Sequence, residues 1–250
     1  MIAFRVETLP AVGSTNDIVR ERAATGAAEG LVVTATEQLA GRGRHGRTWT
    51  SPPGNLYASL LFRPTRPLGE AATLSLVIGL SLADAIEAAA GPERGPDLQL
   101  RLKWPNDVLA GEAKIAGILL ENVAATGEGP AIVAGLGVNV TVAPEGLPYA
   151  ATTLRALGLK ITPEALLERL LARVAADYAR WQADGFAALR ARWLARARGL
   201  GQPAGVRVGE RTVSGRLVDV DDAGHLVLEG PNGRLALNAG ELFFAPVTSR

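Results

Sequence analysis

Cysteine is absent from this 250-residue sequence, and histidine occurs only twice, at His45 and His225. Without cysteine there can be no disulfide, no thiolate nucleophile and no cysteine-ligated metal. Two isolated histidines also argue against a dedicated zinc site, so no metal held by the protein alone is expected. The lack of cysteine fits a reducing compartment, and we expect the protein to be cytoplasmic.

A secretory signal and a membrane span are not expected either. Arg5 and Glu7 interrupt what would be the apolar core of a signal sequence. The longest apolar run, residues 71–90, contains Asp84 and Glu87 and predicts a buried helix rather than a membrane span. We therefore expect no membrane association.

Charge of one sign is also lacking. The net charge is +1, with 48% hydrophobic and 20% charged residues, which is typical of a globular protein with a core. Low hydrophobicity with high net charge, the signature of disorder, is not found. Because the whole molecule has little net charge, any attraction to nucleic acid must come from a local patch.

The hydrophobic patterns predict strands and helices in alternation, followed by a segment of short strands. Strands are expected at residues 31–37, 55–63, 98–103, 107–110, 114–122 and 131–140, and helices at 71–90, 163–184 and 186–197. The glycine-rich residues 199–203 predict a linker, and glycine-punctuated strands after it predict a small β-barrel. We thus predict an α/β (α+β) fold: a mixed β-sheet backed by helices over residues 1–200, then a small β domain over 204–250.

The loop at residues 41–47, Gly-Arg-Gly-Arg-His-Gly-Arg, is the first candidate binding feature. Glycines allow close backbone approach and positive φ, while free amides and arginines favour phosphate or carboxylate oxygens. The loop lacks the Gly-Lys-Ser/Thr ending of a P-loop and the spacing of a dinucleotide-binding turn. By itself it is equally compatible with a surface turn that carries solvated arginines.

Further short segments have polar residues or glycines where a ligand could bind. They are Ser14-Thr-Asn16, Gln38, Thr48-Trp49, Lys-Trp-Pro-Asn-Asp at 103–107, Lys-Ile-Ala-Gly-Ile-Leu at 114–119 and Gly-Leu-Gly-Val-Asn at 135–139. Each has a structural alternative. The first could cap a helix over residues 17–24, the Pro-Asn-Asp run could be a turn, Lys114 could be solvated, and Gly135 and Gly137 could ease helix-on-sheet packing.

In this order and spacing, the segments from about residue 10 to residue 140 resemble the catalytic domain of biotin–protein ligases. The resemblance implies activation of biotin by ATP with Mg²⁺, and transfer from biotinyl-5′-adenylate to a lysine of a biotin carboxyl carrier protein. It also implies that the C-terminal β domain is SH3-like. Bifunctional members place a DNA-binding domain before the first motif, which here begins at Ser14. We therefore expect the monofunctional form, with no specific binding of nucleic acid; monomer and homodimer are both left open.

The resemblance also implies site residues. Biotin-binding residues would be Ser14, Thr15, Asn16, Gln38, Gly41, Arg42, Gly43, Arg44, Lys114 and Gly117. ATP-binding residues would be Arg42, Arg44, Trp49, Asn106, Asp107, Lys114 and Asn139. Lys114, Arg44 and Asp107 would be catalytic, because a fixed cation can offset the repulsion between the biotin carboxylate and the α-phosphate, while Asp107 would orient or deprotonate the carrier lysine. His45 is expected to be solvated and without a role.

Two alternatives compete with this hypothesis. A lipoate–protein ligase would share the fold and the adenylate chemistry. A non-enzymatic nucleic-acid-binding module would use the arginine-rich loop, and its binding would be steeply salt-dependent. For the ligase, we expect the loop to be mobile without ligand, because its glycines are conformationally loose and only ligand oxygens would hold its arginines.

Overall fold

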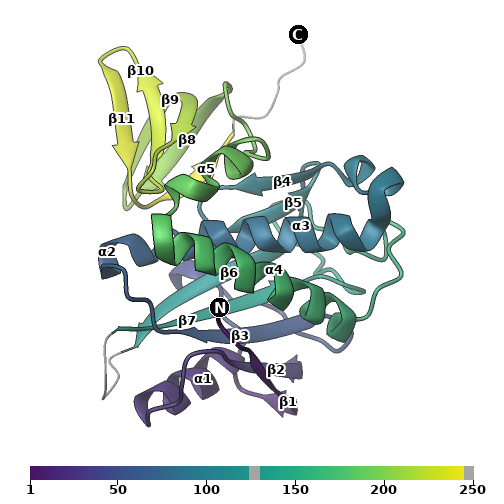
Figure 1. Cartoon of the computed structure of the whole chain (residues 1–250). Coiled ribbons are helices and arrows are strands. Elements are labelled where there is room, and N and C mark those ends of the chain that lie inside the picture. Colours follow the sequence, from purple (N-terminus) through teal and green to yellow (C-terminus); the bar gives the residue numbers. More distant parts are fainter. Residues whose placement is uncertain (124–129, 245–250) are drawn as a thin grey trace.

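The computed structural model describes residues 1–123 and 130–244, so residues 245–250 of the predicted C-terminal domain lie outside the described part. The main feature is a seven-stranded sheet in the order β1-β2-β3-β7-β6-β5-β4 (Figure 1). Its strands are β1 (Arg5–Val12), β2 (Leu31–Gln38), β3 (Leu56–Phe62), β4 (Leu100–Lys103), β5 (Asp107–Ala110), β6 (Ala113–Val123) and β7 (Ala131–Val138). β1 and β2 are parallel and all other neighbours are antiparallel, which confirms the predicted mixed sheet.

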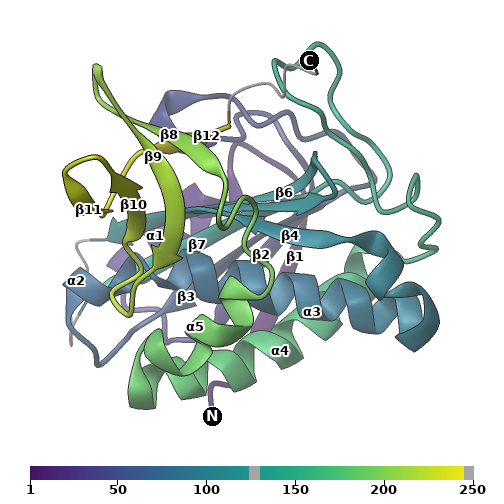
Figure 2. The same ribbon diagram turned by 90° about the horizontal axis from the view of Figure 1, so that it is seen from above.

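Helices cover both faces of this sheet, because its central strands bury alternate residues on opposite sides. On β3, Leu60 and Phe62 join the core beneath α3 (Leu74–Arg94) and α4 (Pro163–Asp184), whereas Leu61 joins a smaller core beneath α1 (Thr15–Ala24). Figures 1 and 2 show α3 and α4 running side by side on one face. Two short helices, α2 (Leu68–Ala71) and α5 (Ala187–Leu194), complete the main layers.

Two sequence-based expectations need correction. No element is predicted over residues 5–12, yet they form the edge strand β1, which is largely exposed and contains Pro10. The helix predicted over 71–90 begins later, at Leu74, and resumes for one turn beyond Gly91, whose φ of 82° interrupts it. Residues 68–94 are long and apolar enough to cross a membrane by length and composition alone, but 67% of their most apolar stretch is buried inside the protein.

A second, five-stranded antiparallel sheet follows in the order β11-β10-β9-β8-β12. Its strands are β8 (Pro203–Val208), β9 (Arg211–Val220), β10 (Leu226–Gly230), β11 (Gly233–Leu237) and β12 (Glu241–Phe243). Within the described residues, no pairing joins the edge strands β11 and β12 into a closed barrel. That this sheet is a separate SH3-like domain with a boundary at residue 204 stays a prediction.

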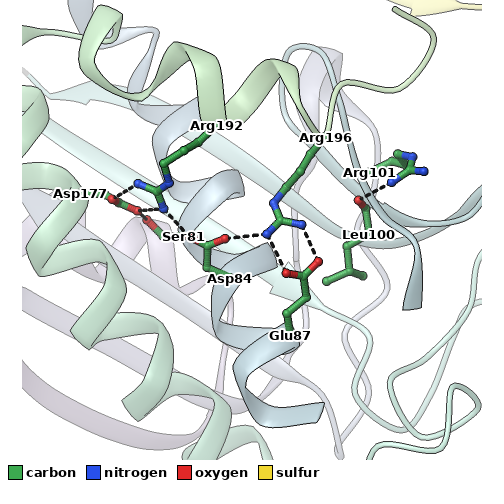
Figure 3. Close-up of polar contacts among 8 residues, drawn as sticks. All are labelled: Ser81, Asp84, Glu87, Leu100, Arg101, Asp177, Arg192 and Arg196. Atoms are coloured by element: carbon green, nitrogen blue, oxygen red, sulfur yellow. Dashed lines mark hydrogen bonds and ion pairs between the residues drawn. The ribbon is translucent and has the colours of Figure 1, made fainter. Parts of the chain in front are cut away.

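Ion pairs fasten α5 to the helices below it (Figure 3). Arg192 donates to Asp177 of α4 at 2.6 Å and also pairs with Asp84 of α3. Arg196 donates to the same Asp84 at 2.9 Å and pairs with both oxygens of Glu87. Bidentate arginine–carboxylate contacts of this kind fix orientation as well as distance, so the chain leaves α5 in a defined direction.

The second sheet is fixed to the first through the same region. Arg190 of α5 donates to both carboxylate oxygens of Asp219, at 2.6 and 2.5 Å, and to the carbonyl of Val220 at 2.6 Å. The indole of Trp104, directly after β4, donates to the carbonyl of Gly224 at 3.0 Å. These contacts hold the end of β9 and the turn after it against α5 and the end of β4.

Candidate active site

A cavity of about 210 Å³ opens between the loop at 41–49, the β5–β6 hairpin, β7 and β12. It collects residues that the sequence scatters over more than a hundred positions. The predicted site residues that line it are Ser14, Thr15, Asn16, Gln38, Arg42, Gly43, Arg44, Trp49, Asn106, Asp107, Lys114 and Gly117. Gly41 and Asn139 do not line it. His45 also borders the cavity but is exposed, as the sequence analysis expected.

The floor of the cavity is a chain of neutral hydrogen-bonding groups. Gln38 Oε1 accepts from the Thr15 amide at 2.9 Å and from its hydroxyl at 3.0 Å. Behind this floor, the hydroxyl of Ser59, which does not itself line the cavity, lies 2.7 Å from that of Thr15 and donates to Asn16 Oδ1 at 2.5 Å. Thr15, Asn16 and Ser59 are all buried. Mixed donors and acceptors without charge suit a neutral polar ring that has both N–H and C=O groups.

The start of α1 shows whether residues 14–16 cap the helix, which was the structural alternative for this segment. Ser14 occupies the N-cap position but makes no side-chain cap hydrogen bond. Thr15 and Asn16, in the first turn, turn their side chains to the cavity floor instead. Ser14 is therefore at the N-cap position, but the side chains of Thr15 and Asn16 form hydrogen bonds in the cavity floor rather than with the helix end. Ser59 was missed, and the only signal for it is a serine inside the otherwise apolar β3.

Three glycines make room for the side chains that cross the sheet. A Cβ added at Gly135 would lie under 3.0 Å from the Asn16 amide, and one at Gly137 would lie under 3.0 Å from the Trp49 indole nitrogen. Gly117 pairs with Gly137 across β6 and β7. Because Asn16 belongs to α1, the contact at Gly135 is the helix-on-sheet packing that the sequence left open, and Gly137 makes room for the loop residue Trp49. Close approach of these strands to a ligand stays a prediction.

Lys114 reaches the cavity because of a β-bulge. Asp107 pairs with Gly117, but the register shifts between Val108 and Leu109, so that Leu109 pairs with Lys114. In regular pairing Lys114 would point to the opposite face from Asp107; the extra residue turns it to the same face. The segment after β7 then fixes its backbone, since its amide donates to the carbonyl of Ala150 at 2.8 Å.

The result is a cation with one carboxylate partner at the cavity wall. Lys114 Nζ lies 2.7 Å from Asp107 Oδ1, and the two side chains are only 16% and 19% exposed. The rings of Trp49 and Tyr149 lie 5.4 and 5.5 Å from the same nitrogen. An ammonium held between a carboxylate and two aromatic rings is preorganised for an incoming anion.

The loop is folded as a narrow hairpin. The Trp49 amide donates to the Gly41 carbonyl at 2.9 Å, and the Gly43 amide donates to the Arg47 carbonyl at 2.7 Å. Its tip is a tight turn in which His45 has a φ of 56°. The backbone is thus closed on itself, and the glycines serve this closure.

Protein groups hold all three arginines of the loop. Arg42 donates to both oxygens of Asp17, at 2.7 and 2.8 Å. Arg44 donates to Asn106 Oδ1 at 3.3 Å, and Arg47 donates to Glu241 at 2.7 Å. The expectation that only ligand oxygens would hold these arginines is therefore wrong, because each already has an acceptor within the protein.

Several groups that the sequence analysis did not select also line the cavity, among them Lys103, Tyr149, Arg198 and Glu241. Burial lowers the pKa of Lys103, and burial likewise lowers the pKa of Arg44. The bond from Arg47 lowers the pKa of Glu241. Lys103 could have been found, since it begins a motif already singled out. Glu241 could not, because only the tertiary structure brings β12 to the loop.

The cavity thus has a neutral polar floor, a cationic wall at Lys114 and a loop that carries arginines. Together these features define a site for a small polar molecule that meets a phosphate or a carboxylate.

Residues 9–139 match the Biotin/lipoate A/B protein ligase family, and residues 199–244 match the Biotin protein ligase C terminal domain. The chain is 42% identical over 225 residues to the biotin–[acetyl-CoA-carboxylase] ligase of Paracoccus denitrificans, covering 85% of this chain and 89% of that one. It is 35% identical to the Mycobacterium tuberculosis enzyme of the same name, covering 95% and 88%.

Among solved structures, the fold is similar to that of a biotin protein ligase from Aquifex aeolicus in complex with biotin and ATP. The TM-score is 0.81 at 28% identity, with 95% of this chain and 97% of that chain covered. The chain belongs to the biotin/lipoate protein ligase family and carries the C-terminal domain of its biotin branch.

Proposed function

We propose that the protein is an ATP-dependent biotin–protein ligase. It converts biotin and ATP to biotinyl-5′-adenylate and pyrophosphate, then transfers the biotinyl group to a lysine of a biotin carboxyl carrier protein. The observation that carries this proposal is the placement of Lys114 in the same cavity as the neutral floor of Thr15, Asn16 and Gln38. The neutral floor suits the uncharged ureido ring of biotin. The end at Lys114 suits the place where the biotin carboxylate meets the α-phosphate of ATP.

In the first half-reaction, a biotin carboxylate oxygen bonds to the α-phosphorus of ATP as the bond to pyrophosphate breaks. Lys114 would sit between the two anions and stabilise the extra charge of the transition state. Asp107 holds that ammonium in place from 2.7 Å. Arg44, beside Asn106 at the cavity wall, would bind the phosphate or the activated carboxyl group.

In the second half-reaction, the neutral amine of the carrier lysine attacks the acyl carbon and AMP leaves. Asp107 would orient the amine and accept its proton. Gly43 and Gly117, which line the cavity, would bring backbone close to biotin, and Ser14 would add a hydroxyl at the start of α1. Gly41 lies outside the lining, so its predicted contact with biotin would require the loop to move. The Arg42 guanidinium is already bound to Asp17, so its predicted contact with ATP would require that pair to open.

Mg²⁺ would neutralise charge on the triphosphate and orient it. Within the described residues there is no group of three or more His, Asp or Glu side chains that could hold a metal. Asp107 and Glu112 both line the cavity, and one or two carboxylates with phosphate oxygens and water are the usual surroundings of this ion. The residues present therefore fit a metal that arrives with ATP.

The remaining ATP contacts are Trp49, against the adenine or the acyl chain, and Asn139. Asn139 is buried: its amide donates to Ile115 and its carbonyl accepts from Leu154, both through backbone. Because Asn139 does not line the cavity, it would support the residues that contact adenine rather than contact adenine itself. We place the protein in the cytoplasm.

The lipoate alternative gains nothing from the site, and residues 199–244 match a domain of biotin ligases. The nucleic-acid alternative is weakened because the three loop arginines are engaged by protein acceptors. The decisive test is incubation with MgATP, a biotin carboxyl carrier domain, and either biotin or lipoate, followed by mass measurement of the carrier. We expect one biotinyl group on one lysine and no lipoyl group; lipoylation, or no modification by either acid, would refute the proposal.

A further inference from the structure

Arg42 extends from the first arm of the loop to two acidic side chains on different elements. Its guanidinium donates to both oxygens of Asp17 on α1, at 2.7 and 2.8 Å. It also lies 3.7 Å from Glu121 Oε1 on β6. Because Arg42 is the cation between two carboxylates, it joins the loop to both the helix and the sheet.

Glu121 carries this contact on to the cavity floor. Its Oε2 accepts from Asn16 Nδ2 at 2.5 Å, and Asn16 Oδ1 accepts from the buried Ser59. The amide of Asn16 therefore has a carboxylate at one end and a hydroxyl at the other, which fixes which way it faces the ligand. The same carboxylate thus touches the loop arginine and a floor residue.

An ordinary surface ion pair would not have this geometry. Exposed pairs contribute little because their side chains remain free to move, and Asp17 has such a pair with Arg20 of its own helix at 2.7 Å. The pair with Arg42 is a fork-to-fork contact, only about a third exposed on either side, and it spans 25 residues of sequence. The bond from Arg42 also lowers the pKa of Asp17, which keeps the carboxylate charged.

We infer that Asp17 and Glu121 are positioning residues: acting through Arg42, they hold the first arm of the loop across the biotin end of the cavity, and Glu121 also sets the orientation of Asn16. This inference rests on the proposed function. It predicts that the pair retains biotinyl-adenylate in the site. The chemistry at Lys114 stands apart from these contacts and keeps its own partners.

The test compares Asp17→Asn, Arg42→Gln and the double variant with wild type and with Arg20→Ala. Arg20→Ala is the matched control, since it removes the other, exposed partner of Asp17. The release rate of preformed biotinyl-adenylate is followed after a chase with unlabelled biotin, and the KM values for biotin and ATP are measured by pyrophosphate exchange. Circular dichroism melting reports on the fold.

We expect adenylate release about five to ten times faster in Asp17→Asn, the size of effect given by one charge-assisted contact. In Asp17→Asn the KM for ATP should not rise above that of wild type, because the change leaves Arg42 free for its predicted contact with ATP. Arg20→Ala should match wild type in every measurement. Because Asp17 acts through Arg42, the double variant should release adenylate no faster than Arg42→Gln. Glu121→Gln should release adenylate faster and should also raise the KM for biotin, because it weakens the hydrogen bond that orients the Asn16 amide.

Unchanged release in Asp17→Asn, or additive effects in the double variant, would overturn the inference. The same holds if Arg20→Ala accelerates release equally, or if only the melting temperature changes. Should Arg42→Gln fail to fold, the comparison of Asp17→Asn with Arg20→Ala decides alone. A wild-type protein that forms no biotinyl-adenylate would instead refute the proposed function, and the two failures are thereby distinguished.

Discussion

Replacing Lys114 with alanine removes the ammonium from the candidate site and leaves its partner behind. Asp107 then keeps a negative charge that is 19% exposed and has lost the cation 2.7 Å away. Both biotin and ATP are anions, so the variant would present them with a carboxylate where wild type presents a compensated pair. The change therefore removes an attraction and uncovers a repulsion.

The magnitude follows from the geometry. A unit charge about 4 Å from a developing phosphate charge contributes about 4 kcal/mol at an effective dielectric constant of about 20. At about 1.4 kcal/mol for each factor of ten, this corresponds to roughly a thousandfold in rate, the upper end of what one lost oxyanion donor costs. The loss of stability should be about 3 kcal/mol, because the change leaves a mostly buried carboxylate without its cation.

The assay is biotin-dependent pyrophosphate exchange at saturating biotin and MgATP, with no carrier present. We expect Lys114→Ala to lose about two to three orders of magnitude in adenylate formation while it remains folded at the temperature of the assay. Adding Asp107→Asn should restore part of the loss by removing the repulsion. Near-normal turnover in Lys114→Ala would refute the role of this lysine, and a double variant slower than the single would refute the reasoning about Asp107.

Three further changes test other parts of the site. Gly135→Ala should push Asn16 off the strand and raise the KM for biotin about tenfold or more, with the KM for ATP unchanged as the internal control. Burial lowers the pKa of Lys103, so its charge should be lost at a pH below the usual value of about 10.4. We predict that the Lys103 ammonium, which lines the cavity, attracts the phosphates of ATP. Exchange should therefore decline on the alkaline side, and Lys103→Arg, which stays charged, should remove that decline; a persistent decline would contradict this role of Lys103. Arg44→Gly should still form adenylate but release it faster, because the variant loses a charge-assisted contact with the ligand. The released adenylate would label exposed lysines of bystander proteins, which quench-flow and mass spectrometry would detect; release no faster than wild type would contradict retention of adenylate by the loop.

Much of the fold was predictable because it depends on local pattern. The predicted helix over residues 163–184 matches α4 in full, since its apolar spacing and its Thr162 cap are local features. The predicted strands match β2 to β7 within a few residues at each end. β1 was not predicted, because an exposed edge strand that contains proline lacks the alternation that marks a half-buried strand.

The ordered motifs likewise predicted which residues gather in the site, and the chemistry of those side chains predicted what it could bind. Nearly all of the residues named from the sequence line one cavity. The sequence could not decide how they are oriented. Lys114 faces Asp107 only because a bulge shifts the register of β6 by one residue, and a one-residue shift reverses the face of every side chain that follows.

The sequence also could not predict which residues bind the arginines of the loop. Arg42 and Arg47 find their acceptors 25 and 194 residues away, at Asp17 and Glu241. No local pattern encodes such pairs, because they form only when α1 and β12 are brought to the loop by packing elsewhere in the chain. Residue identity and spacing thus determined the fold class, the family and the chemistry of the site, while the tertiary structure decided which groups hold the loop and which way Lys114 points.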